Sequence, residues 1–259
     1  MKKFLDLSSW SVAIGSMLIV AFAVVGCDDS SSASAGQNDE LTYGTMTDSR
    51  DGKVYRTVKI GDQTWMAENL NYSDSTKTPS LKGKSWCYNN VAANCDVAGR
   101  LYTWAAAIDS VKLVSDAENP LDCGYGKTCS LTLPVQGICD KGWHLPSQAE
   151  WSTLITKVGG RSTAGTKLKS QSGWYINGNG NGNGDDAFGF SALPAGDRGH
   201  HGYFDNDGDC TSFWSSTENG CTENGCLDAY YMFLYYNSEY AKLDNYYKDS
   251  GFSVRCVKD

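Results

Sequence analysis

Nine cysteines follow Cys27 in this chain of 259 residues, and their spacing suits disulfide bonds better than a metal centre. Three pairs lie close together in the sequence, so that each bond would close one short loop: Cys87 with Cys95, Cys123 with Cys129, and Cys221 with Cys226. Zinc sites built from cysteine usually contain a C-x-x-C pair, and this sequence has none. We therefore expect disulfides, as in exported proteins, and no structural zinc.

Three aspartates at alternate positions, Asp205, Asp207 and Asp209, are a candidate calcium site. Carboxylates spaced in this way can supply the hard oxygen ligands that Ca²⁺ prefers. The segment is not an EF-hand loop, because Gly208 is its fourth residue and Ser216 its twelfth. Calcium takes about six to eight oxygens. An acidic surface turn is therefore the favoured interpretation, and calcium is the only cofactor that we keep as an alternative.

Tyrosines are concentrated near the C-terminus and could form a ligand-binding face. Flat amphipathic rings pack well on sugars and on protein partners. The alternative is that residues 230–236 form a core strand whose side chains alternate between two buried faces. We select Trp174, Tyr231 and Tyr235 as the candidate ligand-binding residues.

Motifs for catalysis are not found in the sequence. It has no nucleophile elbow, no phosphate-binding glycine loop and no zinc-protease motif. His144 is interpreted as a hydrogen-bonded structural residue, because no nucleophile or carboxylate is tied to it by spacing. We therefore expect a protein that is not an enzyme.

The N-terminus has the features of a bacterial export signal. Lys2 and Lys3 precede an apolar run that ends in Gly26-Cys27, and a small residue directly before cysteine resembles a lipobox. We expect removal of residues 1–26 and acylation of Cys27, with palmitate among the lipids, in place of a transmembrane anchor, because about 20 apolar residues are needed to span a bilayer. The polar residues 27–45 would form a flexible tether.

This anchor predicts a location in the bacterial cell envelope, at the outer membrane or the cell surface in preference to the inner membrane. The membrane, through the lipid, is then the first partner. Loss of residues 1–26 takes the formal net charge from −8 to −9, because Lys2, Lys3 and Asp6 are removed. An acidic protein without a basic run is a poor nucleic-acid binder, so we expect no nucleic-acid partner.

Residues 46–259 read as one α+β domain. Residues 53–60 and 63–66 flank Gly61-Asp62 and predict a hairpin. Apolar residues at helical spacing predict one buried-face helix over 101–108 and another that begins at Ser147 and ends before Gly159-Gly160. Ser147 and Glu150 form a capping box.

Later segments read as strands: 213–218, 229–236, 240–243 and 252–257. Helices therefore lie early and strands late, which favours two helices packed on a mainly antiparallel sheet, with many loops.

Six blocks of sequence, in order, carry a resemblance to a known family: Asp51–Leu70, Gly99–Trp104, Gly142–Ser147, Phe190–Gly196, Phe213–Glu218 and Ser253–Cys256. Together they resemble the Fibrobacter succinogenes major paralogous domain over about residues 46–259. The resemblance implies an exported protein or lipoprotein, a biochemical role that is undefined for the family, and a C-type-lectin-like fold.

Two shorter blocks around Leu145-Pro146-Ser147 and Arg255-Cys256 are also similar to the core of formylglycine-generating enzymes. In that fold the first and last strands pair. If the Cys139 strand lies beside the Cys256 strand, these two cysteines close the domain, and Cys210 is left as a free thiol or as a sign that one pairing is wrong. The enzymes use two cysteines with copper, and Cys221 and Cys226 fall in a comparable region, but their flanks lack the expected basic and aromatic residues.

The calcium-dependent sugar site of true C-type lectins is not visible, since Ser215-Ser216 follow Trp214 in place of Asn-Asp. We therefore expect a lipid-anchored, non-catalytic binding or adhesion module for a glycan or a protein ligand. A structural envelope lipoprotein is the first alternative, and a formylglycine-generating-type copper oxidase is the distant one.

Overall fold

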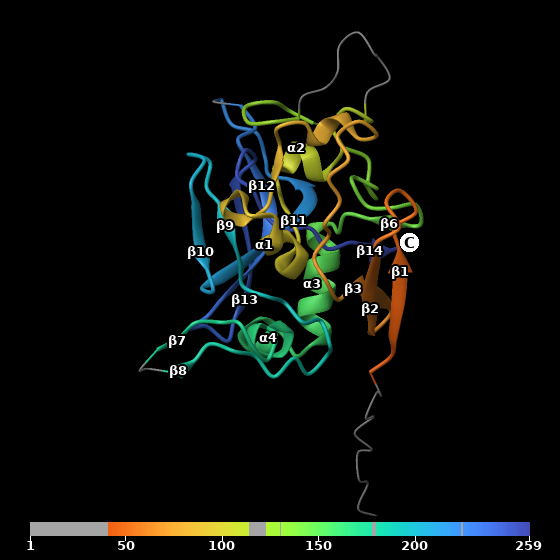
Figure 1. Cartoon of the computed structure of the whole chain (residues 1–259). Coiled ribbons are helices and arrows are strands. Elements are labelled where there is room, and N and C mark those ends of the chain that lie inside the picture. The colour runs from red at the N-terminus through yellow and green to blue at the C-terminus, as the bar shows by residue number, and fades with distance from the viewer. Residues whose placement is uncertain (1–40, 114–122, 130, 178–179, 224) are drawn as a thin grey trace, which may run out of the picture. The chain divides into compact units, whose positions relative to one another are not determined.

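The computed structural model of the chain describes residues 41–113, 123–129, 131–177, 180–223 and 225–259. The predicted signal segment, Cys27 and most of the predicted tether lie outside these residues. None of the helices in the described part has the length and apolar character that a membrane span requires. The ordered domain contains two five-stranded sheets with a helix between them (Figure 1).

The first sheet is antiparallel and has the strand order β1-β2-β3-β14-β6. Its strands are β1 (Tyr43–Thr47), β2 (Val54–Ile60), β3 (Gln63–Met66), β14 (Val257–Lys258) and β6 (Trp143–His144). Gly61 turns the β2–β3 hairpin with a φ of +61°, a left-handed conformation that glycine adopts without steric cost. The last strand, β14, therefore lies between β3, from the N-terminal hairpin, and β6, from the middle of the chain.

The second sheet has the order β10-β9-β11-β12-β13. Its strands are β9 (Ala195–Arg198), β10 (Phe204–Asp207), β11 (Cys210–Glu218), β12 (Asp228–Tyr235) and β13 (Ala241–Tyr247). All neighbours are antiparallel except β9 and β11, which meet in parallel at Gly196 and Thr211. This sheet carries the tyrosine-rich part of the sequence.

Helix α3 (Gln148–Lys157) forms the layer between the two sheets. Its Trp151 ring lies 4.6 Å from that of Trp65 on β3 and 5.7 Å from that of Phe213 on β11, measured between ring centroids. Trp151 and Leu154 are fully buried, and burial of side chains of this size contributes about 1.5–3 kcal/mol each. The predicted capping box is present: Ser147 accepts from the Glu150 amide, and Glu150 accepts from the Ser147 amide.

Shorter elements complete the fold. They are the helices α1 (Ala92–Ala98), α2 (Trp104–Ala107) and α4 (Arg161–Leu168), the 3-10 turns Pro79–Leu81 and Tyr88–Asn90, and two small ladders, β4 (Ser85–Trp86) with β5 (Leu101–Tyr102) and β7 (Ile176–Asn177) with β8 (Gly180–Asn181). The indole of Trp104 on α2 donates to the Ser215 carbonyl at 2.8 Å, and that of Trp214 donates to the Tyr102 carbonyl at 2.7 Å. These two bonds tie α2 and the preceding strand β5 to the second sheet.

The α+β class is confirmed, with three corrections to the arrangement. The described residues contain two main sheets instead of one and four helices instead of two. The helix expected over 101–108 is reduced to α2, because Leu101–Tyr102 pair with β4. Residues 43–45, which the sequence assigned to the tether, belong to β1, because they form a regular ladder with β2.

His144 joins three parts of the domain. Its Nε2 lies 2.7 Å from Glu150 Oε1 and its Nδ1 lies 2.7 Å from Asp259 Oδ1. The hydrogen bond to Glu150 raises the pKa of His144 against the opposing effect of burial, and the bond to Asp259 adds to it. Burial alone would raise the pKa of Glu150, but the bonds from His144 and Ser147 outweigh burial and lower it. His144 is therefore a cationic bridge between two carboxylates.

The raised pKa of His144 predicts a pH-dependent stability. An unfolded histidine has a pKa of about 6.5, so the stabilisation is fully present below about pH 6.5 and is lost as the pH rises through the higher folded pKa. We expect His144→Gln to lower the free energy of unfolding more at pH 5.5 than at pH 8.5, as measured by urea denaturation. Equal losses at both pH values would contradict the cationic state.

Candidate functional site

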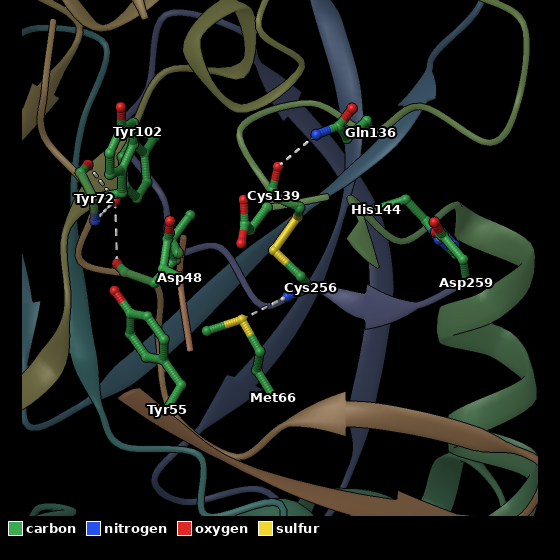
Figure 2. The surroundings of a disulfide bond; sticks show 12 residues. Asp48, Tyr55, Met66, Tyr72, Tyr102, Gln136, Cys139, His144, Cys256 and Asp259 are labelled. Atoms are coloured by element: carbon green, nitrogen blue, oxygen red, sulfur yellow. Dashed lines mark hydrogen bonds and ion pairs between the residues drawn. A yellow bond between two sulfur atoms is a disulfide. The ribbon is translucent and has the colours of Figure 1, made fainter. Parts of the chain in front are cut away.

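The four predicted disulfide pairs are confirmed: Cys87–Cys95, Cys123–Cys129, Cys139–Cys256 and Cys221–Cys226. Figure 2 shows Cys139–Cys256 beside Met66, whose sulfur accepts from the Cys256 amide at 3.4 Å. The Gln136 side chain donates to the Cys139 carbonyl at 3.0 Å. Cys139 and Cys256 are fully buried, so this bond lies inside the domain.

Cys210 is a free and buried thiol. Its sulfur donates to Asp197 Oδ2 at 3.5 Å, and burial, followed by the nearby Asp197 charge, raises its pKa. Because the thiolate is the reactive form of cysteine, Cys210 is held in an unreactive state. Cys210 is thus a free thiol and not a sign that one of the four predicted disulfide pairs is wrong.

Glu218, Cys221 and Cys226 form the only cluster of three candidate metal ligands in the described part of the chain, with ligand atoms within 4.8 Å of one another. The two sulfurs are bonded to each other. The Glu218 carboxylate accepts from the Cys129 amide at 3.1 Å and from the buried ammonium of Lys248. The group therefore fastens two disulfide loops to β13 and to the end of β11.

The residues of the calcium alternative are divided between two elements: Asp205 and Asp207 lie on β10, and Asp209 lies in the turn between β10 and β11. Their carboxylates do not form a metal-ligand cluster within the residues that the structure describes. The two residues between them, Asn206 and Gly208, have left-handed backbones with φ of +65° and +81°, so regular strand alternation does not hold the three side chains on one face. The expected acidic surface turn therefore contains only Asp209, and calcium binding by the three residues stays a prediction.

A cavity of about 520 Å³ is the first candidate for a ligand site. It lies against β2, α1 and the loops around Ser170 and Ser191, and its polar lining includes Arg255 and Asp186. Concave sites where polar groups converge and pKa values are shifted commonly bind ligands. Burial lowers the pKa of Arg255 to about 9 and raises that of Asp186.

Arg255 and Asp186 in this cavity already have partners inside the protein. Arg255 donates from Nε to Asn69 Oδ1 at 2.8 Å, from one terminal nitrogen to the Ser191 carbonyl at 2.8 Å, and from the other to the Phe190 carbonyl. Asp186 accepts from the Ser191 amide at 2.6 Å and from its hydroxyl at 2.5 Å. A ligand would have to displace these bonds. We therefore attribute the cluster to stability.

The aromatic face on β12 is the second candidate. We define it as Tyr231, Phe233 and Tyr235, which alternate along the strand and are all partly exposed. The rings of Phe233 and Tyr235 are nearly parallel, inclined by 19° with centroids 6.0 Å apart. Tyr231 is packed more closely, with its ring 5.0 Å from that of Phe252. Two of the three residues predicted to bind a ligand are thus brought together on one strand.

The third predicted residue, Trp174, is in the wrong place for ligand binding. It is 2% exposed, and its indole donates to the Ala192 carbonyl at 3.0 Å and to Ser170 Oγ at 3.1 Å. The ammonium of Lys169 lies 5.1 Å from its ring centroid. A tryptophan with its indole hydrogen-bonded in the core presents no ring to a ligand, so Trp174 is a packing residue.

A hollow of about 280 Å³ lies beside the aromatic face and is lined by Arg161, Phe233, Tyr235, Ser238, Tyr240 and Lys242. Sequence reasoning missed its two cations. Lys242 lies directly opposite Phe233 in the pairing of β12 with β13. This position follows from the register of the hairpin once the turn between the two strands is placed. Arg161 is the first residue of α4 and reaches the hollow only through tertiary packing. The sequence pattern around it therefore carries no signal.

Comparison with protein-family models gives one match, described as the Fibrobacter succinogenes major domain, over residues 58–258. The chain belongs to this family. In this Fibrobacter succinogenes major domain, the matched residues run from within β2 through β14 and include the aromatic face, the hollow and all four disulfides. A search of curated proteins and a search of solved structures each found no match.

Proposed function

We propose that the mature protein is a lipid-anchored, non-catalytic binding module of the bacterial cell envelope, which holds a glycan against the aromatic face. The partly exposed pair of nearly parallel rings, Phe233 and Tyr235, is the observation that carries this proposal. On the opposite side of β12, Met232 and Leu234 are fully buried in the core. The rings of Phe233 and Tyr235 are therefore not needed to fill it. Partly exposed aromatic rings of this kind suit the apolar faces of sugars.

His144, which the sequence analysis weighed as a possible general base, has a structural position in this domain. Both ring nitrogens of His144 are within 2.7 Å of carboxylate oxygens, so the imidazole is engaged in structure. Cys27 supplies the anchor in this proposal, and the segment up to β1 supplies the reach from the membrane. Mass spectrometry of the N-terminal peptide checks the anchor: an unmodified Cys27 would contradict it.

We further propose that the α+β domain has the C-type-lectin-like arrangement. The pairing of β14 with β3 supports this, because it joins the end of the chain to its N-terminal hairpin. An experimental structure without that pairing would contradict the proposal.

Removal of the Tyr235 ring is expected to abolish most of the glycan binding. We expect Tyr235→Ala to weaken binding on a glycan array by about tenfold or more, which corresponds to about 1.4 kcal/mol. Tyr203→Ala is the matched control, because Tyr203 is 74% exposed but lies outside the aromatic face. If no glycan binds, or if both variants bind equally well, the proposed function is wrong.

A copper-dependent oxidase is a second candidate, because the ligand atoms of Glu218, Cys221 and Cys226 lie close together. Bound copper would supply the redox chemistry by which molecular oxygen oxidises a thiol substrate. The disulfide and the bonds of Glu218 to Lys248 and Cys129 weigh against this candidate. The test is to treat the protein with a mild reductant and to measure oxidation of a peptide thiol with and without copper. Copper-dependent oxidation would favour the oxidase over the binding module.

A further inference from the structure

The hollow beside the aromatic face combines flat rings with positive charge. Phe233 and Tyr235 form one wall, and Tyr240, which is 57% exposed, is a further ring of the lining. Arg161 and Lys242 also line it, although the chain as a whole has a net charge of −8. Because long-range attraction of an acidic ligand is then absent, any preference for negative charge must come from these direct contacts.

The two cations differ in whether a carboxylate of the protein already pairs with them. Lys242 Nζ lies 2.5 Å from Asp244 Oδ2, and the hydrogen bond from Lys242 lowers the pKa of Asp244, with a smaller contribution from Arg161. The Arg161 side chain is exposed and makes no hydrogen bond or ion pair with the residues that the structure describes, apart from the longer-range attraction to Asp244. Its planar guanidinium is therefore free to bind a carboxylate with two parallel hydrogen bonds.

Packing fixes the position of Arg161 relative to the rings. On the same helix, the Gly165 amide donates to the Glu239 carbonyl at 2.8 Å, and a Cβ at Gly165 would lie only 2.6 Å from the Tyr240 carbonyl. The absence of a side chain therefore lets α4 lie directly against the turn between β12 and β13.

Lys169 holds the same turn from inside. Its ammonium donates to the carbonyls of Tyr235, Tyr236 and Ser238 at 3.1–3.2 Å. Because helix and turn are both fastened, the backbone segments that carry Tyr235 and Arg161 are held in place before a ligand binds, which reduces the entropy lost on binding.

Building on the proposed function, we propose that the hollow selects a sugar that carries a carboxylate, such as a uronic acid, with the sugar ring on Phe233 and Tyr235 and the carboxylate on Arg161. Lys242 adds a second positive charge at the same end. Asp244 limits the affinity, because it competes with the ligand for Lys242.

The test is isothermal titration of the full chain with oligogalacturonate and, separately, with its methyl ester, which has the same rings without the charges. We expect the wild type to bind the acid at least about tenfold more tightly than the ester. Arg161→Gln should reduce this preference to about twofold or less, whereas Asp244→Asn should increase it. Lys59→Gln removes another exposed cation, from β2 in the other sheet, and should leave the preference unchanged.

Equal binding of the acid and the ester by the wild type, or an unchanged preference in Arg161→Gln, would overturn this assignment. The proposed function would still stand if Tyr235→Ala weakened binding of both probes. If neither probe binds, the preference for a uronic acid is wrong, and the glycan array then decides separately whether the aromatic face binds any sugar.

Discussion

Replacement of both Cys139 and Cys256 by serine is expected to lower the free energy of unfolding by about 3–5 kcal/mol. The bond closes a loop with a sequence separation of 117, the largest of the four, and it is fully buried beside Met66. In the chain-entropy model, a cross-link over a loop of this length restricts the unfolded state by about 4–5 kcal/mol. Guanidinium denaturation of the oxidised proteins measures the loss.

The matched control is the double serine variant of Cys221 and Cys226, whose separation is only 5. The same model gives about 2 kcal/mol for so short a loop. Equal losses in the two double variants would contradict loop closure as the main source of stability and would point to local contacts around each bond.

Arg255→Met is expected to cost about 2–4 kcal/mol of stability. Methionine has a similar length but leaves the carbonyls of Phe190 and Ser191 and the Asn69 side chain without their donor. The guanidinium also lies over the Phe190 ring, 4.3 Å from its centroid. Urea denaturation at neutral pH, where the Arg255 pKa of about 9 keeps the group charged, is the measurement.

Arg56→Met is the control for Arg255→Met, because Arg56 is exposed and its pairing with Glu68 at 3.3 Å is a surface contact. We expect a change within about 0.5 kcal/mol there. A neutral effect of Arg255→Met would mean that the cost of burying the charge cancels the hydrogen bonds, as it does in some buried ion pairs.

Local signals predicted the elements whose structure is decided within a few residues. The capping box at Ser147 and the glycine-led turn at Gly61 act over one turn of chain, and both are present. Helix α2 was predicted too long, because Leu101–Tyr102 form a ladder with β4, a pairing that helical spacing of apolar residues does not reveal. β1 was missed because four of its five residues are exposed, so that it carries little apolar pattern and is held by pairing with β2.

The candidate site was only half visible in the sequence for a similar reason. Alternation along β12 correctly grouped Tyr231 with Tyr235, since residues two apart share a face of a strand. Trp174 was misplaced because composition does not distinguish an exposed indole from one that donates to a buried carbonyl. Arg161 belongs to the hollow only because Gly165 lets α4 approach the turn between β12 and β13. This is a contact between parts of the chain that are distant in the sequence.

The place of β14 between β3 and β6 has a consequence for the order in which the domain can be completed. Ribosomes make β3 and β6 early, but the strand that joins them is made after the whole second sheet. Until β14 is made, β3 and β6 each have one edge without a neighbouring strand. Asn69, Cys139 and His144 also wait for their partners Arg255, Cys256 and Asp259. Such long-range pairing folds slowly, and the first sheet can close only around a finished chain.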